Sequence, residues 1–281
     1  MHVHHRRDVR PVGRARDLLT AAPMEYQYCK FERAGHVVTI TLNRPEVLNA
    51  LHPAAHQELA LAFDAYAAEP ELRVAIVTGA GDRAFCVGTD LKALAQTGNH
   101  DKPPTGFGGI THRFDLWKPV IAAVNGLCLG GGVEILAACD LAVAADSAQF
   151  GLPEPRVGLA ALGGGALQRL ARDLPLKQAM WLVLRAQRID ATEAQRIGLI
   201  NKVVPANELM NAAHAIANEL LACAPLALQA SKQVMLQSLD ESFAPGMTRR
   251  YEAAERMLAS EDAVEGPRAF AEKRAPNWKG R

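Results

Sequence analysis

Two glutamates occupy positions where a carboxylate is costly or tightly constrained. Glu134 lies in the apolar stretch GLCLGGGVEILAACD, residues 126–140, where a buried acid is unfavourable unless something compensates it. Glu154 lies between Pro153 and Pro155, which stiffen the backbone and remove two N–H donors. Rigid placement suits a catalytic group. The structural alternatives are an exposed glutamate in a first helical turn and an ordinary loop corner.

Three consecutive glycines, Gly130–Gly132, stand between the strand-like VIAAV (residues 120–124) and a helical run. N–H groups at a helix start lack intrahelical partners and favour an anion, whether bound or formed during a reaction. Glycine lets a ligand approach them closely. Because Glu134 follows Gly131 by three residues, both share one helix face. The pattern indicates an acid beside oxyanion donors; the alternative is a tight turn packed on a neighbouring element.

A second turn of this kind lies in GDRAFCVGTDLKAL, residues 81–94. Strand-like AFCVG runs into a helix that we expect to start near Asp90, so the N–H of Thr89 points outwards. Two such N–H groups from separate strand-to-helix turns are what an oxyanion hole needs. Arg83 and Lys92 flank the turn and could meet phosphates, although lone cations are commonly just solvated.

The elements that must position these residues alternate between strand and helix up to about residue 205. We expect a hairpin over residues 26–45 and a helix over 53–69. Buried-type strands are expected at 72–79, 84–88, 118–126, 140–146 and 148–155. This order predicts an α/β layered domain. Residues 206–281 read as a helical appendage, with helices at 225–239 and 241–259, that covers either a neighbouring subunit or its own core.

The segment TGNHDKPPTGFGG, residues 97–109, is rich in glycine and proline. We expect it to be an irregular loop near the site, or else a plain surface insertion. Residues 1–24 differ in composition from the rest and are expected to be a disordered extension. A transit peptide is the alternative there, which two aspartates disfavour.

Composition excludes several classes of protein. A formal net charge of +1 gives no support for nucleic-acid binding, and no apolar run reaches the roughly 18 residues of a membrane-spanning helix. The five cysteines show no metal-type spacing. We expect buried, inert thiols in a reducing compartment and a cytoplasmic protein; a reactive thiol at Cys86 or Cys128 is the alternative.

Several stretches, in this order, resemble the enoyl-CoA hydratase/isomerase superfamily, the crotonases. LNRPEVLNAL is similar to the family's opening strand and turn, AFCVGTDLKAL to its first oxyanion segment, and AAVNGLCLGGGVEILAACD to its second. AQFGLPEPRVGL is similar to the segment with the second acid. RIDATEAQRIGLINKVVP and AFAEKRAPNWKGR also resemble family sequence, so the similarity covers nearly the whole chain from about residue 25.

The resemblance implies a spiral of ββα units over residues 25–205 and a helical trimerisation region over 206–281, with trimers often paired into hexamers. It implies an oxyanion hole formed by the N–H groups of Thr89 and Gly131. Glu134 and Glu154, twenty residues apart as in the family, would be the two acids. The implied coenzyme A contacts are Arg83, the backbone of Val87, Lys92 and, from a neighbouring subunit, Phe270 and Lys273.

The activity implied is an enoyl-CoA hydratase that adds water across the 2,3-double bond of a 2-enoyl-CoA, with no metal or redox cofactor. Keeping both acids favours hydration over the alternatives, an isomerase or an acyl-CoA dehydratase. A non-catalytic, RNA-binding relative is a further alternative, disfavoured by the near-neutral charge. GLAALGGGALQRL (residues 158–170) departs from the family, which often has a proline-containing turn there. Since this region helps to shape the acyl pocket, substrate preference stays open.

Overall fold

The computed structural model describes residues 25–281, so the extension expected at residues 1–24 lies outside the described part. The strands are β1 (Cys29–Ala34), β2 (Val37–Leu42), β3 (Val74–Gly79), β4 (Ala84–Cys86), β5 (Val120–Val124), β6 (Leu127–Leu129), β7 (Leu141–Ala145), β8 (Gln149–Gly151), β9 (Ile189–Asp190) and β10 (Lys202–Val204). The α-helices are α1 (Pro53–Ala68), α2 (Leu91–Thr97), α3 (Gly131–Ala138), α4 (Ala166–Asp173), α5 (Leu176–Arg185), α6 (Ala191–Arg196), α7 (Leu209–Leu221), α8 (Pro225–Ser238), α9 (Phe243–Thr248), α10 (Glu252–Leu258) and α11 (Glu261–Ala271). Short 3₁₀ helices include η2 (Phe107–Gly109) and η3 (Glu154–Val157).

The strands form two sheets. The larger has the order β1-β2-β3-β5-β7-β10, with β1 and β2 antiparallel and the remaining neighbours parallel. The smaller has the order β4-β6-β8-β9. Along the chain, each strand of the first sheet from β3 to β7 is followed by a strand of the second and then by a helix. This repetition is the predicted spiral of ββα units, and the predicted fold class is confirmed.

Helices cover both faces of the larger sheet, whose central strands are buried apolar runs, as expected for parallel strands. Alternate residues of β3 point to opposite faces: Ala75 and Val77 belong to the main core with α1, whereas Val74 and Ile76 pack with α7. Helix α1 begins, as predicted, at Pro53. Its N-terminus is capped by the side chain of His52, which accepts the Ala55 N–H.

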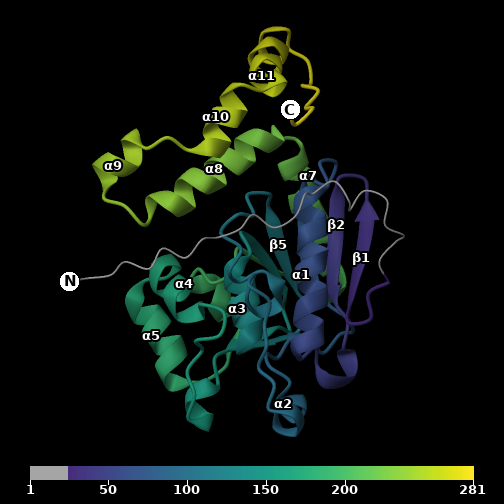
Figure 1. The fold of residues 1–281 in the computed structure, drawn as a ribbon, viewed down its shortest axis with the longest axis vertical. Coiled ribbons are helices and arrows are strands. Elements are labelled where there is room, and N and C mark those ends of the chain that lie inside the picture. Colours follow the sequence, from purple (N-terminus) through teal and green to yellow (C-terminus); the bar gives the residue numbers. More distant parts are fainter. Residues whose placement is uncertain (1–24) are drawn as a thin grey trace, which may run out of the picture.

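Helices α8 to α11 form an arm that stands apart from the sheets (Figure 1). The predicted boundary at residue 206 precedes α7, which packs on the larger sheet, so the arm itself begins at α8. An ion pair between Lys232 and Asp140, at 2.8 Å, ties α8 to the core.

The helix predicted over residues 241–259 is two short helices, α9 and α10, so this prediction was wrong in detail. Tyr251 has an extended backbone between them, and its hydroxyl donates to the Gly246 carbonyl at 2.8 Å. The side chain of Gln233 then accepts the N–H of Ala253 in the first turn of α10. These tertiary bonds favour a break that helical periodicity does not reveal.

Three of the five cysteines, Cys29, Cys86 and Cys128, are buried. Burial raises the pKa of the Cys86 thiol to about 12, so it stays protonated and unreactive at neutral pH. The prediction of buried thiols is wrong for Cys223, which is exposed just after the end of α7, where the chain turns towards α8. None of the helices in residues 25–281 combines the length and apolar character needed to cross a membrane.

Candidate active site

Two strand-to-helix turns lie side by side, one between β4 and α2 and the other between β6 and α3. Their closeness shows at Gly88, where an added Cβ would lie 2.9 Å from the nitrogen of Gly131. Gly88 has φ +93°, a conformation that side chains rarely adopt. The two segments that the sequence singled out as anion-binding turns therefore meet at one place.

The first turn is held by a neighbouring loop. Leu51 donates its N–H to the Gly88 carbonyl at 2.8 Å and accepts the Asp90 N–H at 2.9 Å. Since N–H groups alternate in direction along an extended chain, the N–H of Thr89 points away from Leu51. Within residues 25–281, neither Thr89 nor Gly131 donates its N–H to a protein acceptor. The predicted donors are thus brought together and available.

Asp90 fixes the start of α2 and so the position of Thr89. Its carboxylate accepts the N–H of Ala93 at 3.0 Å and a hydrogen bond from the Arg44 guanidinium at 2.9 Å. Although burial raises the pKa of this carboxyl, the hydrogen bonds from Ala93 and Arg44 outweigh burial, and its pKa is lowered. Asp90 is therefore ionised and paired at neutral pH.

At each position of the Gly130–Gly132 triplet, the backbone conformation or a close contact requires glycine. Gly130 has φ +54°. A Cβ on Gly131 would lie 2.3 Å from the ring of Phe107, and one on Gly132 would lie 2.1 Å from the Cys86 carbonyl oxygen. The triplet is therefore the tight, packed turn that the sequence analysis gave as the alternative. It also begins α3, and the N–H of Gly131 has no protein acceptor in residues 25–281.

Glu134 is buried in α3, with 3% of its surface exposed, which excludes an exposed glutamate. Its Oε1 accepts the N–H of Gly164 at 2.6 Å. A Cβ on Gly164 would lie 2.7 Å from Oε2 of the same carboxylate. The turn before α4 therefore holds this carboxylate in place.

Glu154 opens η3 and reaches the Gly130 turn, which leads into the helix that carries Glu134. A Cβ on Gly130 would lie 2.9 Å from its Oε1, and its Oε2 is buried without a hydrogen-bond partner in residues 25–281. Burial, with a smaller contribution from the charge of Glu134, raises the pKa of Glu154. The two predicted acids thus contact different glycine turns, Glu134 the turn at Gly164 and Glu154 the turn at Gly130, and they lie in different environments.

Two aromatic side chains, which the sequence analysis did not identify, support the Gly130–Gly132 turn. His56 lies against Phe107, with ring centroids 4.4 Å apart, and its Nδ1 accepts the Gly108 N–H at 3.0 Å. Burial, assisted by the positive charge of Lys102, lowers the pKa of His56 to about 4. The ring is therefore neutral at physiological pH. Nothing in the sequence around His56, a histidine within a helix, indicated that it would support the turn.

Arg169 of α4 was also missed. Its guanidinium donates to the Gly164 carbonyl at 2.9 Å and to the Thr111 carbonyl at 2.7 Å. It thereby braces the turn that donates to Glu134. The second glycine triplet, Gly163–Gly165, was the available signal, but nothing local links it to an acid thirty residues earlier.

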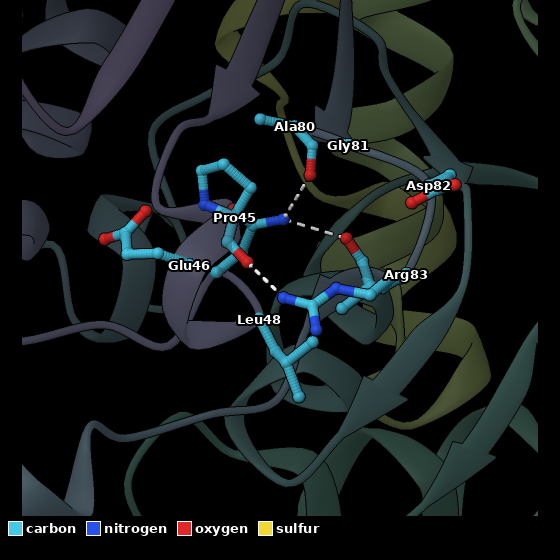
Figure 2. Close-up of a pocket in the computed structure, with 9 residues that line it drawn as sticks. Pro45, Glu46, Leu48, Ala80, Gly81, Asp82 and Arg83 are labelled. Carbon is cyan, nitrogen blue, oxygen red and sulfur yellow. Dashed lines mark hydrogen bonds between the residues drawn. The ribbon is translucent and has the colours of Figure 1, made fainter.

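Arg83 lines a cavity of about 260 Å³ between segment 45–49 and the turn at 80–84 (Figure 2). Its guanidinium donates to the Pro45 carbonyl at 2.8 Å, and the remaining N–H groups can meet an anion. Val87 is half-buried beside the Gly130 turn, and Lys92 is exposed on α2. All three residues belong to the segment that runs from the residue before β4 through the first turn into α2.

Phe270 and Lys273 lie at the end of α11 in the arm, at the opposite end of the molecule from α2 (Figure 1). Phe270 is 88% exposed. The chain does not bring these two residues to its own turns, so their predicted contact with coenzyme A stays a prediction about a neighbouring subunit.

Comparison with known proteins identifies the class to which this fold and site belong. The family model for enoyl-CoA hydratase/isomerase matches residues 32–281. The chain belongs to this family, the crotonases, and is an enzyme of that family; the resemblance seen in the sequence is confirmed.

Particular relatives carry two kinds of name. Carnitinyl-CoA dehydratase of Proteus mirabilis is 43% identical over 256 residues, which cover 88% of this chain and 96% of that protein. That of Escherichia coli O157:H7 is 43% identical over 258 residues, covering 89% and 97%. The solved enoyl-CoA hydratase of Mycobacterium tuberculosis H37Rv superposes with a TM-score of 0.85 at 38% identity, covering 90% of this chain and 99% of that one.

Proposed function

We propose that the protein is an enoyl-CoA hydratase, which adds water to a 2-enoyl-CoA to give a 3-hydroxyacyl-CoA. The observation that carries the proposal is the pair of unlike glutamates, Glu134 in the helix that begins at the Gly130–Gly132 turn and Glu154 against Gly130. Glu134 accepts the N–H of Gly164, whereas Glu154 has an oxygen without a hydrogen-bond partner in residues 25–281, and burial raises its pKa. A raised pKa suits Glu154 to the role of general acid, and the hydrogen-bonded Glu134 is assigned the role of base.

The thioester carbonyl would lie between the N–H groups of Thr89 and Gly131. Both donors are fixed before reaction, so they stabilise the developing enolate oxygen with little reorganisation. Arg83 and Lys92 would face phosphates of coenzyme A, for which a guanidinium is well suited.

In the proposed reaction, Glu134 orients a water molecule and accepts one of its protons as the water oxygen bonds to C3. The electron pair of the double bond moves towards the carbonyl, giving an enolate. Glu154 donates a proton to C2, and the carbonyl re-forms. The sum is addition of one water molecule across the double bond, and proton exchange between the close acids returns both to their starting states.

Dehydration of a 3-hydroxyacyl-CoA is the same path in reverse and is the second candidate. It is favoured by the carnitinyl-CoA dehydratase names of relatives at 43% identity. Double-bond isomerisation would need only one of the acids to move a proton.

The test follows the ultraviolet absorbance of crotonyl-CoA with the wild type, Glu134→Gln and Glu154→Gln. Loss of the conjugated thioester band is expected for the wild type, with kcat about 10²- to 10⁴-fold lower in each variant, as for loss of a general acid or base. Glu32→Gln, at an exposed position of β1, is the control. Bond migration without hydration, or full activity in either variant, would contradict two-acid hydration.

A further inference from the structure

Lys102 lies in the irregular loop after α2 and has no part in the proposed hydration. Its Nζ lies 5.9 Å from the centre of the buried Phe107 ring. A methyl group on Gly163 would lie 2.9 Å from this Nζ and 3.5 Å from Oε2 of Glu134. One small substrate group could therefore contact the ammonium and lie beside the catalytic carboxylate.

A narrow cavity connects Lys102 with Thr89. It has a volume of about 40 Å³ and is also lined by His56, Asp90 and Asp101. This volume accommodates only a few atoms. Lys102 thus shares one cavity with Thr89 and reaches towards Glu134 at Gly163, which is where we place the far end of a short acyl chain.

The ammonium of Lys102 is available to a ligand. Among residues 25–281, no carboxylate oxygen lies within 4.0 Å of its Nζ. Asp90, on the cavity wall, is already paired with Arg44 at 2.9 Å. His56 on the same wall is neutral at physiological pH, so it does not compete for an anion.

We propose that Lys102 determines specificity by selecting acyl-CoA substrates with a carboxylate at the far end of a short acyl chain. The proposal rests on the proposed function and names its substrate class. A substrate carboxylate would otherwise lie near Glu134 and Glu154, which repel it; a charge-assisted hydrogen bond from Lys102 offsets that repulsion. A quaternary ammonium at the same place meets a like charge.

The experiment compares three probes that differ at one group. In 2-pentenoyl-CoA the chain ends in methyl, in glutaconyl-CoA a carboxylate replaces that methyl, and in 4-trimethylammonio-2-butenoyl-CoA a quaternary ammonium takes its place. We expect wild-type kcat/KM to be highest for glutaconyl-CoA and lowest for the cationic probe. Lys102→Gln should lower the ratio of glutaconyl-CoA to 2-pentenoyl-CoA about tenfold, the effect of one hydrogen bond to a charged group.

Two further variants test the charge itself. Lys102→Arg should keep most of the preference, and Lys102→Glu should shift it towards the cationic probe. Lys30→Gln, on exposed strand β1, removes the same charge away from the site and should leave the three ratios unchanged.

A binding measurement separates the failure of this proposal from that of the proposed function. If the wild type hydrates none of the probes, hydration is wrong, and calorimetric dissociation constants of glutaryl-CoA and valeryl-CoA then test Lys102. A preference for glutaryl-CoA that Lys102→Gln removes supports the proposal. An equal ratio in wild type and Lys102→Gln, for kcat/KM or for binding, overturns it.

Discussion

Two glycine triplets, Gly130–Gly132 and Gly163–Gly165, each lead into a helix, but they differ in what they face. In the first, a Cβ added at any of the three glycines would clash with Glu154, Phe107 or Cys86. In the second, Gly164 meets the carboxylate of Glu134, and Gly163 meets the flexible end of Lys102. The first triplet is proposed to hold the substrate and the second holds the acid. A glycine run therefore indicates available N–H groups without indicating what uses them.

Among substitutions in the two glycine triplets and their supports, the largest effect is expected from Gly131→Ala. The new Cβ would lie 2.3 Å from the Phe107 ring, so either the ring or the proposed donor must move. Losing one oxyanion donor typically lowers kcat about 10²- to 10³-fold. Steady-state hydration of crotonyl-CoA measures this, with coenzyme A affinity by calorimetry as the control. Near-normal kcat would show that Gly131 is not a donor.

Gly164→Ala tests the second triplet. Its Cβ would lie 2.7 Å from Oε2 and 2.8 Å from Cβ of Glu134, so the carboxylate must shift. We expect kcat to fall about 10- to 100-fold, because small displacements of a catalytic group have effects of this size. Gly163→Ala, next to it, is the matched control with a smaller expected loss. Equal losses in the two variants would contradict a specific role for Gly164.

Arg169→Met should have a moderate effect, since it removes the brace on the Gly164 carbonyl rather than a donor to Glu134. We expect kcat to fall by up to about tenfold with little change in KM, as for loss of a supporting hydrogen bond. Arg172→Met on the same helix removes only an exposed pair with Asp240 and serves as the control. A change in KM alone would argue against a positioning role.

The smallest effect concerns stability. The raised pKa of Glu154 means that the folded protein binds this proton more readily than the unfolded chain, so stability falls as pH rises above the unfolded pKa of about 4.3. Glu154→Gln removes this penalty. Its Tm should exceed that of the wild type at pH 7 by about a degree or two, and the difference should shrink as pH falls towards 4.3. Glu32→Gln should show no such trend.

The parts of the fold that follow from local pattern were predictable. The hairpin around Gly35, the helix beginning at Pro53 and the helix after Gly130–Gly132 are each specified by neighbouring residues. The break at Tyr251 was not, because it depends on contacts with Gln233 and Gly246.

The candidate site divides in the same way. Glu134, Glu154 and the two turns could be found from residue type and spacing. The bond from Gly164 to Glu134 joins residues thirty positions apart, and the approach of Lys102 depends on the course of an irregular loop. Such contacts need the assembled tertiary structure, which hydrophobic periodicity does not encode.

The contact between Gly88 and Gly131 bears on how this enzyme can change by mutation. Because a methyl group on Gly88 would lie 2.9 Å from the Gly131 nitrogen, either turn can be displaced only by disturbing the other. Substitutions at the two positions should therefore be strongly epistatic, and a second substitution should add little once the first has been made. The proposed oxyanion donors therefore form one unit under selection, and Phe107, whose ring packs on Gly131, belongs to the same unit.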